Sequence, residues 1–131
     1  MNLVVDASAI LEILLQTPKA RTLSRRVLKS GLGLHAPHLL DLEVLQVLRR
    51  LEREGRLAPD RAQVSADLLA DFPLQRQPVT ALIARIWALR QNMTAYDAAY
   101  VALAEALDAP LVTCDARLGR APGHAARIEV V

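Results

Sequence analysis

The sequence has few cysteine, lysine and aromatic residues: one Cys, two Lys and four aromatic side chains in 131 residues. A single Cys114 excludes an internal disulfide and any zinc site built from several cysteines. The few aromatic rings leave little surface for stacking nucleobases, so a contact with nucleic acid would depend on phosphates and shape.

Long hydrophobic runs are also missing. No stretch approaches the roughly 20 apolar residues that a membrane-spanning helix requires. The apolar start of the chain is interrupted by Asp6 and Glu12 and lacks a basic beginning and a cleavage site, so we expect no signal peptide. These features favour a soluble, cytoplasmic protein without a membrane partner.

The charged residues are few but biased. They make up 23% of the chain, against 53% hydrophobic residues, and the net charge is +2. Fourteen of the 16 basic residues are Arg, whose planar fork suits phosphate or carboxylate. A GC-rich genome would produce the same bias, so both explanations stay open. The length and composition predict one domain, residues 1–131, with a substantial core.

Short apolar runs alternate with helical patterns along the whole chain. We expect strands at 2–5, 32–35, 109–115 and 126–131, with a brief extended piece at 73–78. We expect helices at 6–16, 18–30, 38–55, 58–72, 79–91 and 94–107, and a helical turn at 116–121. Strands that alternate with helices predict an α/β fold, a three-layer α/β/α sandwich around a short parallel sheet.

Two of the expected strands end on an acid. Asp6 directly follows the strand 2–5, and Asp115 follows the apolar run "PLVT" with only Cys114 between. Ligands of open parallel sheets gather at the carboxyl ends of the strands. The two carboxylates are therefore expected at the same edge of the sheet.

Two further acids interrupt apolar helices. Glu43 stands beside the apolar stripe of the helix 38–55, and Asp97 lies next to Tyr96 on what we expect to be a buried face. A buried, ionised carboxylate is costly unless something compensates it. A divalent cation such as Mg²⁺ or Mn²⁺ would explain Asp6, Glu43, Asp97 and Asp115 together, and would suit hydrolysis of a phosphoester.

Each acid also has a plainer explanation. Asp6 and Asp115 could be N-caps of the helices that follow them. Thr94 and Asp97 have the spacing of a capping box, and Glu43 could face solvent. Substitution of Asp97 by Asn distinguishes these alternatives. If Asp97 is only a cap, the melting temperature should barely change, because Asn caps a helix about as well as Asp. If the acids form a metal site, they repel one another when it is empty, and Asp97→Asn should raise the melting temperature in chelator.

With these residues assembled, the chain resembles the PIN-domain family and, within it, VapC-type toxins of bacterial toxin–antitoxin pairs. The resemblance rests on "VVDASAILEILL", "LLDLEVLQVLRRL" and "TAYDAAYVALAEAL…PLVTCDARL", in that order over essentially the full length. It implies a PIN-like fold with Asp6, Glu43, Asp97 and Asp115 as catalytic and metal-binding residues, supported by the hydroxyls of Ser8 and Thr113.

The resemblance also implies an activity and partners. It implies a Mg²⁺- or Mn²⁺-dependent endoribonuclease that cuts structured RNA (tRNA or rRNA), forms a homodimer and is silenced by a VapB-type antitoxin. Arg117, Arg49 and Arg50 are candidate substrate contacts, with solvated arginines as the alternative. Helical segments 7–30 and 58–91 are candidates for the dimer and antitoxin surfaces. A non-cleaving RNA- or protein-binding module of the same fold is the alternative function.

Other residues have expected structural positions. His35 is expected at a surface or turn, and Trp87 in the core or a dimer surface. Asp41 is expected to favour the first turn of its helix through the helix dipole.

Overall fold

A parallel sheet forms the centre of the protein. The computed structural model describes residues 1–29 and 31–131, and within them five strands are arranged in the order β3-β2-β1-β4-β5. Every pairing in this sheet is parallel, which confirms the predicted α/β class. The strands are β1 (Asn2–Val5), β2 (Gly33–Pro37), β3 (Gln75–Gln77), β4 (Leu111–Thr113) and β5 (Ile128–Val130).

The middle of the sheet is buried on both faces. Leu3, Val4 and Val5 of β1 are inaccessible to solvent, as are Leu111 and Val112 of β4. Consecutive apolar residues are typical of a strand that is covered by helices on both sides. The residues that follow β1 and β4 therefore have fixed positions at the carboxyl edge of the sheet.

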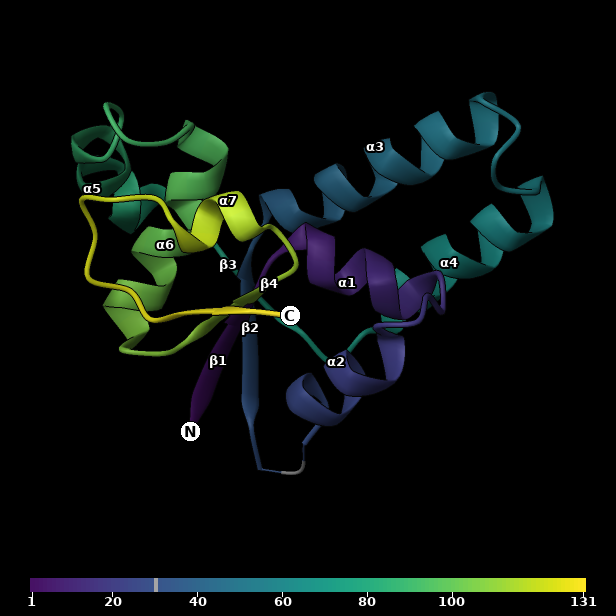
Figure 1. The fold of residues 1–131 in the computed structure, drawn as a ribbon, viewed down its shortest axis with the longest axis horizontal. Coiled ribbons are helices and arrows are strands. Elements are labelled where there is room, and N and C mark those ends of the chain that lie inside the picture. Colours follow the sequence, from purple (N-terminus) through teal and green to yellow (C-terminus); the bar gives the residue numbers. More distant parts are fainter. Residues whose placement is uncertain (30) are drawn as a thin grey trace.

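Helices cover the two faces of the sheet, as Figure 1 shows. On one side α6 (Ala95–Leu107) packs on β1, β2 and β4 and carries α5 (Ile83–Ala88); on the other, α1 (Ala7–Leu14) packs on β4 and on its neighbouring helices. Those neighbours are α2 (Ala20–Val27), α3 (Leu39–Arg53) and α4 (Pro59–Asp71), and the short α7 (Ala116–Gly119) follows β4. The predicted three-layer sandwich is confirmed.

Element bounds differ from the sequence prediction mainly at helix ends. The expected helix 79–91 is a 3-10 turn, η1 (Thr80–Leu82), followed by α5. The expected helix 18–30 ends as α2 at Val27, and Ser30 lies outside the described residues. Beyond α3, Gly55 has a φ of +71°, a left-handed position that favours Gly.

Two expectations about individual side chains, those for Tyr96 and His35, are wrong. Tyr96 is 65% exposed and not part of a buried face, because it lies in the first turn of α6, before the buried stretch 98–104. The helix α3 also carries exposed apolar residues, with Leu42 71% exposed. His35 is buried in β2 between Asn2 and Gln77, both within hydrogen-bonding distance of its ring. Trp87 is exposed, so of its two expected positions, the core or a dimer surface, the core is excluded.

Among the helices of the described chain, none combines the length and the hydropathy needed to cross a bilayer.

Candidate metal and nuclease site

Asp6 is the deepest of the predicted acids. It caps α1, where its Oδ1 accepts hydrogen bonds from the Ala9 backbone N–H (3.2 Å) and from Ser8 Oγ (2.6 Å). Its Oδ2 accepts a hydrogen bond from Thr113 Oγ1 at 2.5 Å. The capping role considered from the sequence is therefore real, and the side chain is nevertheless held in a buried, hydrogen-bonded position beside β4.

Ser8 and Thr113 connect the ends of β1 and β4. Their hydroxyl oxygens lie 3.2 Å apart, and Ser8 Oγ accepts a hydrogen bond from the backbone N–H of Cys114 at 2.9 Å. Thr113 Oγ1 accepts one from the N–H of Asp115 at 3.0 Å. These bonds fix the turn after β4 relative to Asp6, which is the supporting arrangement expected for both hydroxyls.

Glu43 enters the site from the first turns of α3. Its Oε1 accepts a hydrogen bond from the hydroxyl of Tyr100 at 2.5 Å, and Tyr100 is a buried residue of α6. A buried phenol needs a partner for its hydroxyl, and this one orients the carboxylate of an adjacent helix. Glu43 is half-buried and not fully solvated.

Asp97 and Asp115 are joined by one arginine. Nη2 of Arg117 lies 3.1 Å from Asp97 Oδ2 and 3.0 Å from Asp115 Oδ2. Thr94 accepts the backbone N–H of Asp97, so the N-cap of α6 exists, but the Asp97 carboxylate contributes to the pair with Arg117. The capping-box alternative therefore explains only the backbone of Asp97.

Charge interactions link the four acids in pairs: Asp115 with Asp6, Asp6 with Glu43, and Glu43 with Asp97. Burial raises the pKa of Asp6, an effect opposed by hydrogen bonds from Ser8, Thr113 and Ala9, and the charge of Asp115 raises it further. Burial likewise raises the pKa of Glu43; the Tyr100 hydroxyl lowers it, and the charges of Asp6 and Asp97 raise it. The pKa of Tyr100 is raised by burial and then by Glu43.

These raised pKa values predict the pH dependence of the metal-free protein. A carboxyl whose pKa is higher in the folded than in the unfolded state destabilises the fold as pH rises from about 4 through the folded pKa. The pKa of His35 is lowered by burial, which gives a slope of the opposite sign, so a difference measurement is needed. We therefore compare the free energy of unfolding of Glu43→Gln with that of wild type, both in chelator. The variant's value minus the wild-type value is expected to increase with pH.

Urea denaturation at a series of pH values measures this difference. Gln retains an oxygen that accepts the Tyr100 hydroxyl, so the substitution removes mainly the charge. A difference between Glu43→Gln and wild type that stays constant with pH would contradict the raised pKa of Glu43.

The donor chemistry of the site fits a hard divalent cation. Four carboxylates from β1, α3, α6 and the turn after β4 converge, and carboxylate oxygens are ligands of Mg²⁺ and Mn²⁺. As the side chains stand in residues 1–29 and 31–131, no three His, Cys, Asp or Glu are grouped closely enough to hold a metal ion. Arg117 lies between two of the four acids.

The other predicted site residues fall into two groups. Arg117 lies at the acids and lines a cleft of 340 Å³ together with Asn92, Asp97 and Arg120. Arg49 and Arg50 are exposed on α3, nearly two helical turns beyond Glu43, and the structure does not bring them to the acids. A second cleft lies beside Glu43, lined by Leu42 and Tyr96.

Sequence reasoning missed Tyr100 as a site residue. Its ring is buried in the packed part of α6. Its position three residues after Asp97 places both on one side of α6, and this spacing could have indicated a shared site. Asp41 also has a partner that was not expected: it lies in the first turn of α3, as predicted, and pairs with Arg76 at 3.0 Å.

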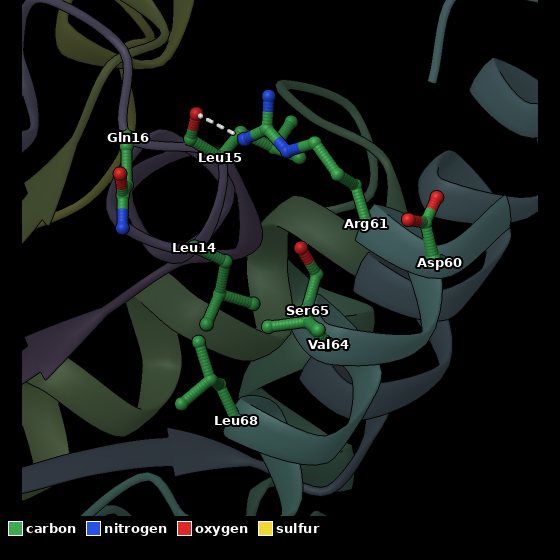
Figure 2. Close-up of a pocket in the computed structure, with 8 residues that line it drawn as sticks. All are labelled: Leu14, Leu15, Gln16, Asp60, Arg61, Val64, Ser65 and Leu68. Carbon is green, nitrogen blue, oxygen red and sulfur yellow. Dashed lines mark hydrogen bonds between the residues drawn. The ribbon is translucent and has the colours of Figure 1, made fainter. Parts of the chain in front are cut away.

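Another concave surface lies away from the acids. A pocket of 390 Å³ lies between the end of α1 and α4. In Figure 2, Leu14, Val64 and Leu68 face one another, and Arg61 reaches the carbonyl of Leu15. An adjoining groove of 760 Å³ shares Leu14 and Leu68 and extends to α2 and Phe72. Both are lined from the two segments predicted to carry partner surfaces, 7–30 and 58–91.

The fold and the acidic site together define a protein family. The chain belongs to the PIN-domain family, whose model matches residues 3–123. Within that family it is similar to ribonuclease VapC9 of Mycobacterium tuberculosis, with 45% identity over 116 residues, covering 88% of this chain and 87% of the relative. The predicted resemblance to VapC-type toxins is confirmed.

Solved structures share the fold. The VapBC2 structure from Rickettsia felis, bound to a DNA fragment from its promoter, superposes with a TM-score of 0.71 at 14% identity and covers 99% of this chain and 98% of that one. VapC20 of Mycobacterium tuberculosis, described as a sarcin-ricin loop cleaving toxin, gives 0.67 at 16% identity, covering 89% and 92%.

Proposed function

We propose that this protein is an endoribonuclease and the toxin of a VapBC-type pair. The observation that carries the proposal is the convergence of Asp6, Glu43, Asp97 and Asp115 from four separate parts of a PIN-domain chain. Strong similarity to a relative named as a ribonuclease supports the same activity.

The proposed cofactor is Mg²⁺ or Mn²⁺, held by Asp6, Glu43, Asp97 and Asp115. When bound, such a cation activates a water and stabilises the charge that develops on the scissile phosphate. Ser8 and Thr113 keep Asp6 in place through the bonds described above, and Tyr100 orients Glu43. Each of these neighbours fixes a carboxylate before substrate arrives.

The proposed substrate is structured RNA, of the tRNA or rRNA class. Among the predicted contacts, Arg117 lies at the acids and is suited to a phosphate near the reacting bond. Arg49 and Arg50 are suited to phosphates farther along an RNA that crosses α3, because an exposed guanidinium binds phosphate without reading sequence. The similarity in fold to a toxin that cleaves the sarcin-ricin loop is compatible with this class.

The proposed partners are a VapB-type antitoxin and a second copy of this chain. The grooves between α1, α2 and α4 are lined by apolar and polar side chains together, a composition suited to a segment of another protein. Exposed apolar residues beside the site, Leu42 and Tyr96 together with Ile83 and Trp87 of α5, are candidates for the homodimer surface. The proposed location is the cytoplasm, where tRNA and rRNA are found.

Cleavage of total tRNA and rRNA by antitoxin-free protein tests the function. With Mg²⁺ or Mn²⁺ we expect discrete products that chelator abolishes and that Glu43→Gln does not produce. Glu52→Gln is the matched control, because it makes the same change at an exposed position of the same helix, and it should cleave like wild type.

The alternative function, a non-cleaving binding module, predicts another result. RNA would be retained without discrete products under every metal condition, and Glu43→Gln would bind it like wild type. Metal-dependent products lost in Glu43→Gln and retained in Glu52→Gln would exclude this alternative.

A further inference from the structure

Arg117 is held at the acidic site by charge and not by packing. One nitrogen of its guanidinium contacts carboxylates from two elements, at 3.0 and 3.1 Å. Its own side chain is 66% exposed, whereas Asp97 and Asp115 are 21% and 33% exposed. A long side chain with so little packing can leave the acids at small cost.

We propose that Arg117 is an internal counter-cation, which competes with the divalent cation for Asp97 and Asp115 and is released when the cation takes these oxygens. The inference rests on the proposed metal-dependent function. Arg117 would then have two positions. In the metal-free protein it contacts Asp97 and Asp115, and after the cation binds it can contact a phosphate of the substrate.

The competition follows from the geometry of the contacts. Arg117 uses an Oδ2 oxygen of each acid, and a cation bound between the same oxygens would meet a positive charge at hydrogen-bonding distance. Two cations cannot share such a position without strong repulsion. The guanidinium must therefore move when the metal ion enters.

The surroundings give Arg117 a place to move. The cleft of 340 Å³ that it lines also contains Asn92 and the exposed Arg120. The backbone N–H of Arg117 continues to donate to Asp115 Oδ1, at 2.9 Å, so the start of α7 does not depend on the side-chain pair. Only the side chain needs to change position.

Calorimetric titration of Mn²⁺ into metal-free, full-length protein tests the competition. Arg117→Gln should bind Mn²⁺ about fivefold more tightly than wild type, because two exposed ion pairs no longer oppose the metal. Arg120→Gln is the matched control: it removes the same charge from the same cleft but neither ion pair, and should stay within about twofold of wild type.

Melting temperatures give a readout that does not depend on the titration. In chelator, Arg117→Gln should melt at a lower temperature than wild type, because Asp97 and Asp115 have lost their counter-charge. Saturating Mn²⁺ should raise the melting temperature of Arg117→Gln by more than it raises that of wild type. Arg117→Lys retains the charge without the planar fork, so its melting temperature in chelator should lie between those of Arg117→Gln and wild type.

The outcomes distinguish this inference from the proposed function. If wild type binds Mn²⁺ and cleaves RNA while Arg117→Gln binds no more tightly than Arg120→Gln, the competition is refuted and the nuclease stands. If wild type does not bind Mn²⁺, the cation site and the role of Arg117 are both refuted.

Discussion

Replacing Asp6 by Asn is expected to reduce RNA cleavage by about 1000-fold or more while leaving the fold intact. Removing one preorganised group that stabilises transition-state charge costs about 100- to 1000-fold in other enzymes, and Asp6 is also a proposed metal ligand. Binding of Mn²⁺, followed by calorimetry, should weaken in parallel with cleavage.

The fold should tolerate Asp6→Asn because each hydrogen bond has a replacement. The Asn oxygen can keep the bonds from Ser8 and Ala9, and the Asn amide can donate to Thr113, whose hydroxyl can turn from donor to acceptor. Since burial raises the pKa of Asp6, its charge destabilises the metal-free fold at neutral pH. The variant should therefore melt at or above the wild-type temperature in chelator.

Asp67→Asn is a suitable control, since Asp67 is an exposed residue of α4. It should retain full cleavage and metal binding. Wild-type cleavage by Asp6→Asn would refute the role of Asp6, and loss of cleavage accompanied by a fall in melting temperature would show only that the fold had been damaged.

The two acids at strand ends were the most predictable part of the site. Parallel strands bring their carboxyl ends to one edge, and because β1 pairs with β4, the Asp after each of them lies at neighbouring strand ends. Glu43 was predictable for a different reason, as a charge beside the apolar stripe of α3. In each case a general rule about burial or topology was sufficient.

The contacts between side chains were not predictable in the same way. Tyr100 belongs to a buried helical face, and the sequence does not show that its hydroxyl emerges opposite Glu43 of another helix. The pairing of Arg117 with Asp97 depends on how the turn after β4 packs beside α6. Both contacts join residues whose separation along the chain has no periodic pattern.

The Arg117 pair also changes how Asp97 should be tested. From the sequence, Asp97→Asn was expected to relieve repulsion and raise the melting temperature in chelator. In the structure Asp97 already has a counter-charge, so the substitution removes an attractive pair as well as a repulsive neighbour. These two effects oppose each other, and Asp6→Asn is the cleaner variant because the donors to Asp6 in the described chain, Ser8, Ala9 and Thr113, are neutral.

Thr113→Val is expected to destabilise the metal-free protein by about 2–3 kcal/mol near pH 8. Thr113 is fully buried, and its hydroxyl donates to a buried carboxylate at 2.5 Å while accepting the N–H of Asp115. A hydrogen bond to a charged group contributes about 1.5–3 kcal/mol, and a buried donor left without a partner adds to the loss. Val keeps the shape and the strand preference of Thr in β4, so urea denaturation in chelator reports the hydroxyl.

Two comparisons identify the partner responsible for that loss. Thr113→Ser keeps the hydroxyl and removes one methyl group, so it should cost about 1 kcal/mol. In an Asp6→Asn background the Asn amide donates to the Thr113 hydroxyl instead, and the cost of Thr113→Val should fall by about 1 kcal/mol because a hydrogen bond between neutral groups is weaker than one to a carboxylate. An equal cost in both backgrounds would mean that Thr113 stabilises the turn at Asp115, and that the buried Asp6 carboxylate is held by Ser8 and the start of α1 alone.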